Sequence, residues 1–331
     1  MNKFLIVAGY GWSGSSALID LLREYENTVV PDVEFRIIKD PYGIAELMNS
    51  LVYQWDYINS SAAIDDFVWL CKKCNRDCKH FYNPFGLSYN SILTNNFLSI
   101  THDYINKLTS FNYLGSNYNK EFKKNYFNSS YRRFARSLNS RTGIKLPYKE
   151  SISYFSKPTK ELFLKATQEY LQSLFAEKYD NKIIVLDQAI SPLHFDQLQF
   201  FGEDCKMIIV DRNPWDIYID MINNKSLIGS DLVNTHDVSK YYIWHESIRP
   251  ETYEHNKVLL VSFEKLVREY ETEKERIEGF ISWDLGKQVS KQLYFKPSES
   301  KKNIDINPNN ICSPEEISSI KKYFSSGDNN E

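Results

Sequence analysis

The sequence predicts an α/β protein in which a parallel sheet is covered by helices. Its strand-like runs consist mostly of apolar residues with little polar alternation, so both faces of each strand should be buried. Segments with helical periodicity lie between or after these runs, which is the order of βαβ units. The chain has 331 residues, of which 42% are hydrophobic and 15% aromatic. This composition supports a sizeable core and excludes a disordered chain.

Five short runs are expected to form the sheet, because each consists mostly of Ile, Val and Leu. The expected strands are Lys3–Ala8, Val33–Ile38, Lys182–Asp187, Lys206–Asp211 and Lys257–Val261, and the expected helices are Ser15–Tyr25, Glu161–Lys178, Pro214–Ile222 and Phe263–Phe280. Residues 43–157 have no comparable strand, so we expect a largely helical insertion within one domain of residues 1–331. No Gly/Ser-rich linker flanks the insertion, and residues 325–331 should form a disordered tail.

Charge and hydropathy restrict the partners and the location. The chain carries 40 Lys and Arg residues against 43 Asp and Glu residues, a net charge of −3. Without a general basic field, nucleic acid is not an expected partner, and a local cluster must hold any anionic ligand. The apolar run Phe4–Ala8 is too short for a signal peptide or membrane span. Five cysteines, an odd number, fit a reducing compartment, so the cytoplasm is expected; the sequence defines no oligomeric state.

A glycine-rich turn follows the first expected strand. Residues 9–16 read G-Y-G-W-S-G-S-S and lead into a helix. Such a turn directs backbone N–H groups and a helix N-terminus at one place, which suits a tetrahedral oxyanion. The spacing from Gly9 to Gly14 matches a Walker A loop, but Ser15 replaces its Lys, which disfavours an ATPase. Taken alone, the turn is equally consistent with a tight βα connection with capping serines.

A second informative segment, residues 207–218, reads M-I-I-V-D-R-N-P-W-D-I-Y. A buried strand ends in an arginine, and a proline is placed to open a helix. Together with the glycine-rich turn, this segment resembles the sulfotransferases that use 3'-phosphoadenosine-5'-phosphosulfate (PAPS), of the bacterial carbohydrate or small-molecule type. Ser13–Ser16 is similar to the family's 5'-phosphosulfate loop, and Arg212–Asp216 to its 3'-phosphate motif. Val258–Val267 and Ser300–Ile304 resemble two later family segments.

The resemblance implies a P-loop-like sulfotransferase fold and PAPS as the sulfuryl donor, with no metal. The residues that it assigns to PAPS binding are Gly11, Trp12, Ser13, Gly14, Ser15, Ser16, Arg212, Lys225, Lys301 and Lys302. Two positions depart from the pattern: Trp12 stands where many members carry Lys or Arg, and Asp220 where many carry a Ser that contacts the 3'-phosphate. A carboxylate there would repel the ligand, so Lys225 or Ser226 is expected to supply the contact.

Sulfuryl transfer requires in-line geometry, cations around the equatorial oxygens and a base for the acceptor's proton. Glu34 and Arg36 share one face of the expected second strand, and this E-x-R arrangement resembles that of tyrosylprotein and some carbohydrate sulfotransferases, where the Glu is the base. We therefore expect Glu34 to be the base and Arg36 to position the substrate or sulfonate. The alternative is a surface ion pair. His102 is the competing base, and His80 and His194 lie in the same interval.

Further polar residues are candidates by position. Lys39 and Asp40 follow the expected second strand and are candidates for the missing cation or the acceptor pocket. Gln188 follows a strand at the edge where α/β proteins bind ligands, although a turn-forming role is equally consistent. Cysteines 71, 74 and 78 with His80 offer four metal ligands within ten residues, but their spacing favours one helical face over a zinc site.

The predicted function is transfer of a sulfuryl group from PAPS to a hydroxyl or amine of a carbohydrate or other small polar acceptor. The reaction would be an in-line displacement with a carboxylate base, and residues 43–157 would choose the acceptor. Two alternatives stay open. One is a catalytically silent protein that binds PAPS or its product 3',5'-adenosine bisphosphate, in which Trp12 and Asp220 reflect lost chemistry. The other is a degenerate P-loop nucleotide kinase, which Ser15 opposes.

Overall fold

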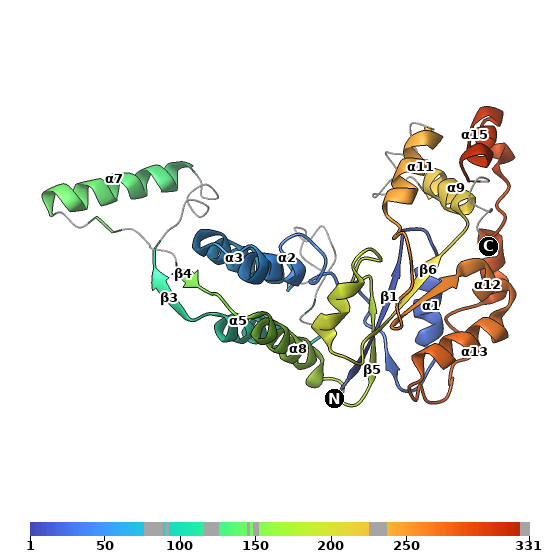
Figure 1. Ribbon diagram of the computed structural model, residues 1–331, viewed down its shortest axis with the longest axis horizontal. Helices are drawn as coiled ribbons and strands as arrows, with labels where there is room; N and C mark the ends of the chain where they lie inside the picture. Colours follow the sequence, from blue (N-terminus) through green and yellow to red (C-terminus); the bar gives the residue numbers. More distant parts are fainter. Residues whose placement is uncertain are drawn as a thin grey trace. The chain divides into compact units, whose positions relative to one another are not determined.

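The computed structural model describes residues 1–75, 89, 93–115, 126–143, 146–147, 152–224 and 237–324. The chain forms two compact units, one of Met1–Arg36 with Tyr179–Glu331 and one of Ile37–Lys178. We call them the sheet unit and the helical unit after their main contents (Figure 1). Within the described ranges, no helix is both long enough and apolar enough to cross a membrane.

The sheet unit is built on five strands that all run parallel. They are β1 (Lys3–Gly9), β2 (Thr28–Val29), β5 (Ile183–Asp187), β6 (Lys206–Asp211) and β7 (Val258–Ser262). Their order is β2-β5-β1-β6-β7, with β1 between β5 and β6. Because the strands are parallel, their carboxyl ends share one edge, where the loops after β1, β5, β6 and β7 meet. The predicted α/β class, with a parallel sheet flanked by helices, is confirmed.

The predicted strand Val33–Ile38 is wrong. The edge strand is instead the two-residue β2, and Pro31 follows it without an N–H donor to continue the ladder. Phe35 is buried, and its backbone N–H donates to the Asp187 carbonyl at 2.9 Å. In this segment Val33, Phe35 and Ile37 alternate with Glu34 and Arg36, a pattern that a strand also has, so the sequence alone could not distinguish the loop from a strand.

Helices of the sheet unit form its outer layers. They are α1 (Ser15–Leu22), η2 (Phe195–Phe201), α9 (Pro214–Asn224), α11 (Val238–Ser247), α12 (Phe263–Arg268), α13 (Tyr270–Ile281), α14 (Pro297–Ser300), η3 (Lys301–Asn303), η4 (Pro308–Asn310) and α15 (Pro314–Phe324). The predicted single helix Phe263–Phe280 is two helices, because Glu269 has φ −119° and ψ 43° and interrupts it. The break allows Leu266 of α12 and Ile277 of α13 to enter the same core.

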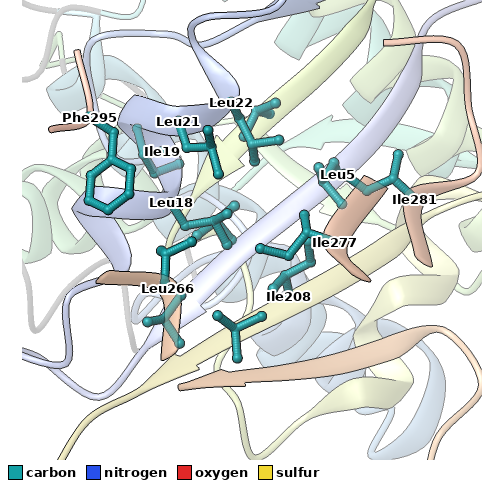
Figure 2. Close-up of a cluster of buried hydrophobic side chains, with 14 of the residues drawn as sticks. Leu5, Leu18, Ile19, Leu21, Leu22, Ile208, Leu266, Ile277, Ile281 and Phe295 are labelled. Carbon is teal, nitrogen blue, oxygen red and sulfur yellow. The ribbon is translucent and has the colours of Figure 1, made fainter. Parts of the chain in front are cut away.

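The main core lies between α1, α12, α13 and one face of the sheet (Figure 2). Leu5 and Ile208 supply the strand side of this core, and Leu18 and Leu22 supply the α1 side. All four side chains are 0–1% exposed. Burial of such side chains stabilises by roughly 1.5–3 kcal/mol each, so the position at which α1 leaves the sheet is held firmly. The loop between β1 and α1 is therefore fixed at both of its ends.

A buried carboxylate anchors the chain just after α1. Glu24 is completely buried, and its two oxygens accept from Gln288 Nε2 at 2.7 Å and from the backbone N–H groups of Gln292, Tyr294 and Phe295 at 3.0–3.1 Å. Four donors satisfy the charge that burial would otherwise penalise. The contact ties α1 to a segment about 270 residues later in the chain.

The helical unit consists of α2 (Ile44–Met48), the π-helical turn η1 (Asn49–Tyr53), α3 (Tyr57–Cys74), α5 (Phe97–Leu108), α7 (Tyr126–Thr142), α8 (Lys160–Ala176) and the antiparallel pair β3 (Phe111–Leu114) and β4 (Ile152–Phe155). Tyr104 of α5 stacks on Tyr170 of α8 with 4.5 Å between ring centroids. The pair β3 and β4 was not expected, because β3 is exposed throughout and resembles a loop. The unit runs from residue 37 to 178, beyond the expected 43–157, and includes α8. Residues 325–331 lie outside the described ranges.

Candidate functional site

The glycine-rich loop joins the centre of the sheet to α1. Tyr10 N–H donates to the Ser13 hydroxyl at 3.1 Å, so this serine side chain closes the turn. Gly11 and Gly14 have φ +72° and +87°, in the left-handed region that favours glycine. A Cβ on Gly14 would lie 2.3 Å from the Phe263 ring. The first N–H groups of α1, at Ser15 and Ser16, have no earlier helical carbonyl to bind, so the loop has the geometry of an anion site.

Gln188 reaches the loop from the neighbouring strand. It follows β5 with φ +55°, and its backbone N–H donates to the Val7 carbonyl at 2.8 Å. Its side-chain Nε2 donates to the Ser15 hydroxyl at 3.4 Å. The structure therefore places Gln188 at the expected sheet edge and beside the expected phosphosulfate loop.

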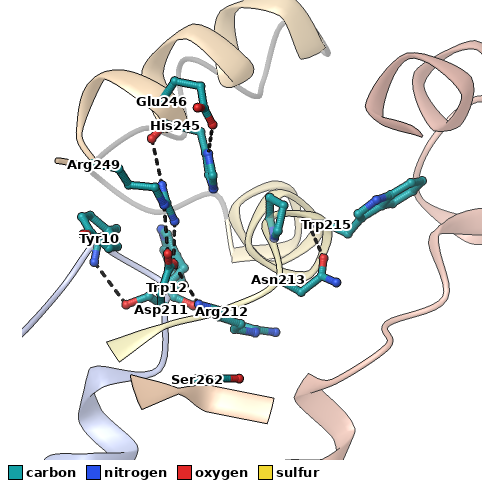
Figure 3. Close-up of polar contacts among 12 residues, drawn as sticks. Tyr10, Trp12, Asp211, Arg212, Asn213, Trp215, His245, Glu246, Arg249 and Ser262 are labelled. Atoms are coloured by element: carbon teal, nitrogen blue, oxygen red, sulfur yellow. Dashed lines mark hydrogen bonds and ion pairs between the residues drawn. The ribbon is translucent and has the colours of Figure 1, made fainter. Parts of the chain in front are cut away.

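Arg212 comes directly after β6 (Figure 3). It joins three segments of the sheet unit. Its side chain is 4% exposed. Nη1 donates to the Trp12 carbonyl at 3.0 Å and to Asp220 Oδ2 at 2.6 Å, and Nη2 donates to the Asn303 carbonyl at 2.5 Å. Arg212 thus links the glycine-rich loop, helix α9 and the C-terminal turn η3. Asp220, which was expected only to repel a phosphate, is the ion-pair partner of this arginine.

The C-terminal segment 301–306 is attached to the first turn of α9. Asp216, 2% exposed, accepts hydrogen bonds from the backbone N–H groups of Asp305 at 3.1 Å and Ile306 at 2.9 Å. Burial raises the pKa of the Asp216 carboxyl, and the two donors act in the opposite direction. Lys301 and Lys302 are exposed on η3, next to the residue whose carbonyl binds Arg212. Their contact with a nucleotide stays a prediction.

Trp12, at the position where many members of the resembled family have a cation, has φ +59° and a half-buried side chain. This side chain packs against an apolar cluster that α9, α11 and α15 form, which includes Ile217, Tyr241 and Ile320. The residue therefore contributes a carbonyl to Arg212 and a ring to the neighbouring cluster.

Beside the loop lies a polar cluster that the sequence analysis missed (Figure 3). Arg249 forms a two-point ion pair with Asp211, with Nε–Oδ2 at 3.0 Å and Nη2–Oδ1 at 2.6 Å. Its guanidinium lies 4.3 Å from the centre of the Tyr10 ring, and the Tyr10 hydroxyl is 2.7 Å from that of Tyr253. The one signal in the sequence was Asp211 itself, because a carboxylate at the end of a buried strand needs a partner.

His245 belongs to the same cluster. The residue is 6% exposed, and Nδ1 lies 2.9 Å from Glu246 Oε1. Nε2 has no hydrogen-bond partner among the residues that the structure describes. Burial, and then the charge of Arg249, lower the pKa of His245. The neutral imidazole is therefore the favoured form in the folded protein.

Glu34 and Arg36 form an ion pair with 2.8 Å between Oε2 and Nη1. The side chains are 43% and 34% exposed. They flank Phe35, whose hydrogen bond to Asp187 holds this segment at the carboxyl end of β5. The pair thus sits on a loop at the expected edge of the sheet, and Glu34 as the base stays a prediction.

Other candidates fall in the helical unit or outside the described ranges. His102 is exposed on α5, and Lys39 and Asp40 lie in the turn before α2. Cys71 and Cys74 are both buried on α3, and burial raises the pKa of Cys71. The described ranges hold no group of three or more residues able to bind a metal. Outside these ranges lie Cys78, His80, Lys225 and Ser226, while His194 is exposed before η2.

Comparisons with known proteins give structural matches only. No protein-family profile and no curated protein sequence matches the chain. The sulfotransferase domain of the olefin synthase from Synechococcus PCC 7002 matches with a TM-score of 0.39 and 12% identity, over 97% of this chain and 94% of that one. The sulfotransferase domain of the curacin biosynthetic pathway matches with a TM-score of 0.37 and 11% identity, over 98% of each chain.

Sulfotransferase STF9 from Mycobacterium avium matches with a TM-score of 0.40 and 10% identity, over 98% of this chain and 76% of that one. A further match is sulfotransferase STF1 from Mycobacterium tuberculosis. All four matched structures are sulfotransferases.

Proposed function

We propose that the chain transfers a sulfuryl group from PAPS to a hydroxyl or amine of a carbohydrate or another small polar acceptor. The observation that supports this most is the meeting of two anion-binding elements at one sheet edge. The loop after β1 offers backbone N–H groups, and Arg212 after the adjacent β6 lies within hydrogen-bond distance of the same loop. Their order along the chain is that of the resembled family. Cysteine usage supports a cytoplasmic location.

In this proposal, PAPS supplies the sulfuryl group and leaves as 3',5'-adenosine bisphosphate. The loop N–H groups and the N-terminus of α1 bind the phosphosulfate and stabilise charge on the departing phosphate oxygen. The acceptor oxygen forms the new bond to sulfur in line with the breaking S–O bond, and Glu34 accepts the acceptor's proton. Arg36, paired with Glu34, positions the acceptor or sulfonate, and Lys301 and Lys302 offset the negative charge of the nucleotide.

Acceptor choice is assigned to the helical unit. Its aromatic residues can stack on sugar faces. A cavity of about 420 Å³ lies between α5 and α8 and is lined partly by Asp103, Lys107 and Tyr170. His102, adjacent to Asp103 in the chain, is the alternative base, which would suit a hydrophobic alcohol or phenol better than a sugar.

Calorimetry with the bisphosphate and with ATP tests the nucleotide assignment. We expect tighter binding of the bisphosphate, because ATP lacks the 3'-phosphate that the proposal assigns to Arg212, while the Walker Lys is replaced by Ser15. Equal affinities would contradict the assignment. Sulfuryl transfer from PAPS to a panel of sugars, amines and phenols, followed by mass spectrometry, then tests the reaction and identifies the acceptor class.

A catalytically silent nucleotide-binding protein is the second candidate. It is favoured by Trp12 in place of the cation and by the internal pairing of Arg212 with Asp220. Bisphosphate binding without transfer to any acceptor in the panel would support this reading. Phosphoryl transfer from ATP would instead support the kinase alternative.

A further inference from the structure

The Arg212 guanidinium already binds an anion that belongs to the protein itself. Asp220 Oδ2 lies 2.6 Å from Nη1, and two carbonyl oxygens, those of Trp12 and Asn303, take further donors. All three partners are negative or partly negative. The arginine side chain is 4% exposed and its Asp220 partner 21% exposed, so solvent screens this pair weakly.

Charge balance at this point leaves little attraction for another anion. One guanidinium charge is cancelled by one carboxylate at contact distance, and both Nη1 donors are engaged. Nε of Arg212 is buried and has no hydrogen-bond partner among the described residues, so this donor of the guanidinium faces neither solvent nor an acceptor. A phosphate that approaches this fork must either displace the carboxylate or lie next to it, and like charges at such separations repel strongly in a partly buried site.

We infer that Asp220 is an internal competitor for the anion that Arg212 binds, and that it sets how strongly the chain selects a nucleotide with a 3'-phosphate. This inference rests on the proposed function. In the ligand-free protein Asp220 holds Arg212 against the glycine-rich loop and η3. When the bisphosphate binds, its 3'-phosphate takes the Nη1 donor that Asp220 occupies, and the carboxylate turns to solvent, toward which it is already partly exposed.

The test compares two nucleotides that differ only in the 3'-phosphate. Dissociation constants for 3',5'-adenosine bisphosphate and adenosine 5'-monophosphate are measured by calorimetry for the wild-type chain, Asp220→Asn and Asp220→Ser. The ratio of the two constants isolates the contribution of the 3'-phosphate. We expect this ratio to grow in favour of the bisphosphate by tenfold or more in both variants, a change of about 1.4 kcal/mol.

Asp305→Asn is the matched control. It removes the same unit of charge from the segment next to η3, but its carboxylate is 75% exposed and pairs with Arg268 instead of Arg212. The ratio in this variant should stay within twofold of wild type. Because removing Asp220 leaves a buried arginine unpaired, both Asp220 variants should melt earlier, and the stabilisation by bisphosphate should be larger in them than in wild type. The melting shift keeps the test informative if either variant is too unstable for calorimetry.

Three outcomes would overturn the inference. An unchanged or smaller ratio in both Asp220 variants, with bisphosphate still bound by wild type, contradicts the competition and leaves the proposed function standing. An equal rise in Asp305→Asn would show a general charge effect. If neither wild type nor any variant binds the bisphosphate, the proposed nucleotide site itself is wrong and the inference fails with it.

Discussion

Replacing Gly14 by Ala tests whether the glycine-rich loop is held against α12 as the structure shows. Gly14 has φ +87°, and a Cβ there would lie 2.3–2.9 Å from three atoms of the Phe263 ring. Phe263 is 3% exposed in the main core, so its ring cannot move away freely. Gly11 offers a matched comparison, because it has φ +72° and a Cβ there would meet nothing within 4 Å.

The two substitutions share one energetic term and differ in the other. A left-handed conformation for Ala costs about 1–2 kcal/mol at either position. Overpacking against a buried ring adds about 1–3 kcal/mol at Gly14 alone. We therefore expect Gly14→Ala to lower the free energy of unfolding of the sheet unit by about 2–5 kcal/mol, and Gly11→Ala by about 1–2 kcal/mol. Bisphosphate affinity should fall more for Gly14→Ala, because the N–H groups of Ser15 and Ser16 follow the displaced residue.

Urea unfolding followed by circular dichroism measures both variants, in the wild-type chain and in a Phe263→Leu background. The smaller side chain makes room for a Cβ, so the excess penalty of Gly14→Ala should fall by at least half, while that of Gly11→Ala should not change. Equal penalties for the two glycines in both backgrounds would refute the described contact between the loop and α12.

Four further changes probe the site and its support. Glu34→Gln should abolish sulfuryl transfer while bisphosphate affinity changes less than twofold, because the amide keeps the shape but accepts no proton; full turnover in this variant, with loss in His102→Ala, would favour the histidine as base. Replacing Lys301 and Lys302 together by Ala should weaken bisphosphate binding about tenfold at low salt and less at high salt, since screening reduces the lost attraction. A loss of affinity that is the same at both salt concentrations would argue against an electrostatic contact of these lysines with the nucleotide. The lowered pKa of His245 means that below about pH 6.5 the unfolded chain binds a proton that the folded chain resists. Stability should therefore fall as the pH decreases through that range, and the melting temperature of His245→Gln should depend less on pH there. If the melting temperatures of wild type and His245→Gln change with pH in parallel, the result would count against a buried neutral imidazole. Glu24→Gln turns one accepting oxygen into a donor that faces other donors, and should lower stability by about 1–3 kcal/mol in urea unfolding, without a change in m-value.

Local rules in the sequence were sufficient for four of the five strands of the sheet and for the glycine-rich loop. The inner positions of β1, β5 and β6 are buried on both faces and are apolar, and the edge strand β7 is also apolar along most of its length, so these four strands were recognisable. The positive φ angles at Gly11 and Gly14 require residues that tolerate them, which marks the loop in the sequence. Pro214 marks the start of α9, because a backbone N–H in the first turn of a helix has no acceptor within the helix, and proline lacks that N–H.

The tertiary structure alone decided which polar groups meet. Arg249 pairs with an aspartate 38 residues earlier, and Asn303 supplies a carbonyl to an arginine 91 residues earlier. Arg249 stands in no motif that the sequence analysis recognised. Asn303 lies in the segment Ser300–Ile304, but the resemblance of that segment gave its backbone carbonyl no role. Both contacts depend on which segments end side by side in the fold. The same reason explains Asp220: its sequence position indicated repulsion of a ligand, and only the packed structure showed that the carboxylate neutralises Arg212. The spacing of apolar residues along the sequence indicates which faces are buried, whereas charge pairing at the sheet edge depends on contacts between distant segments.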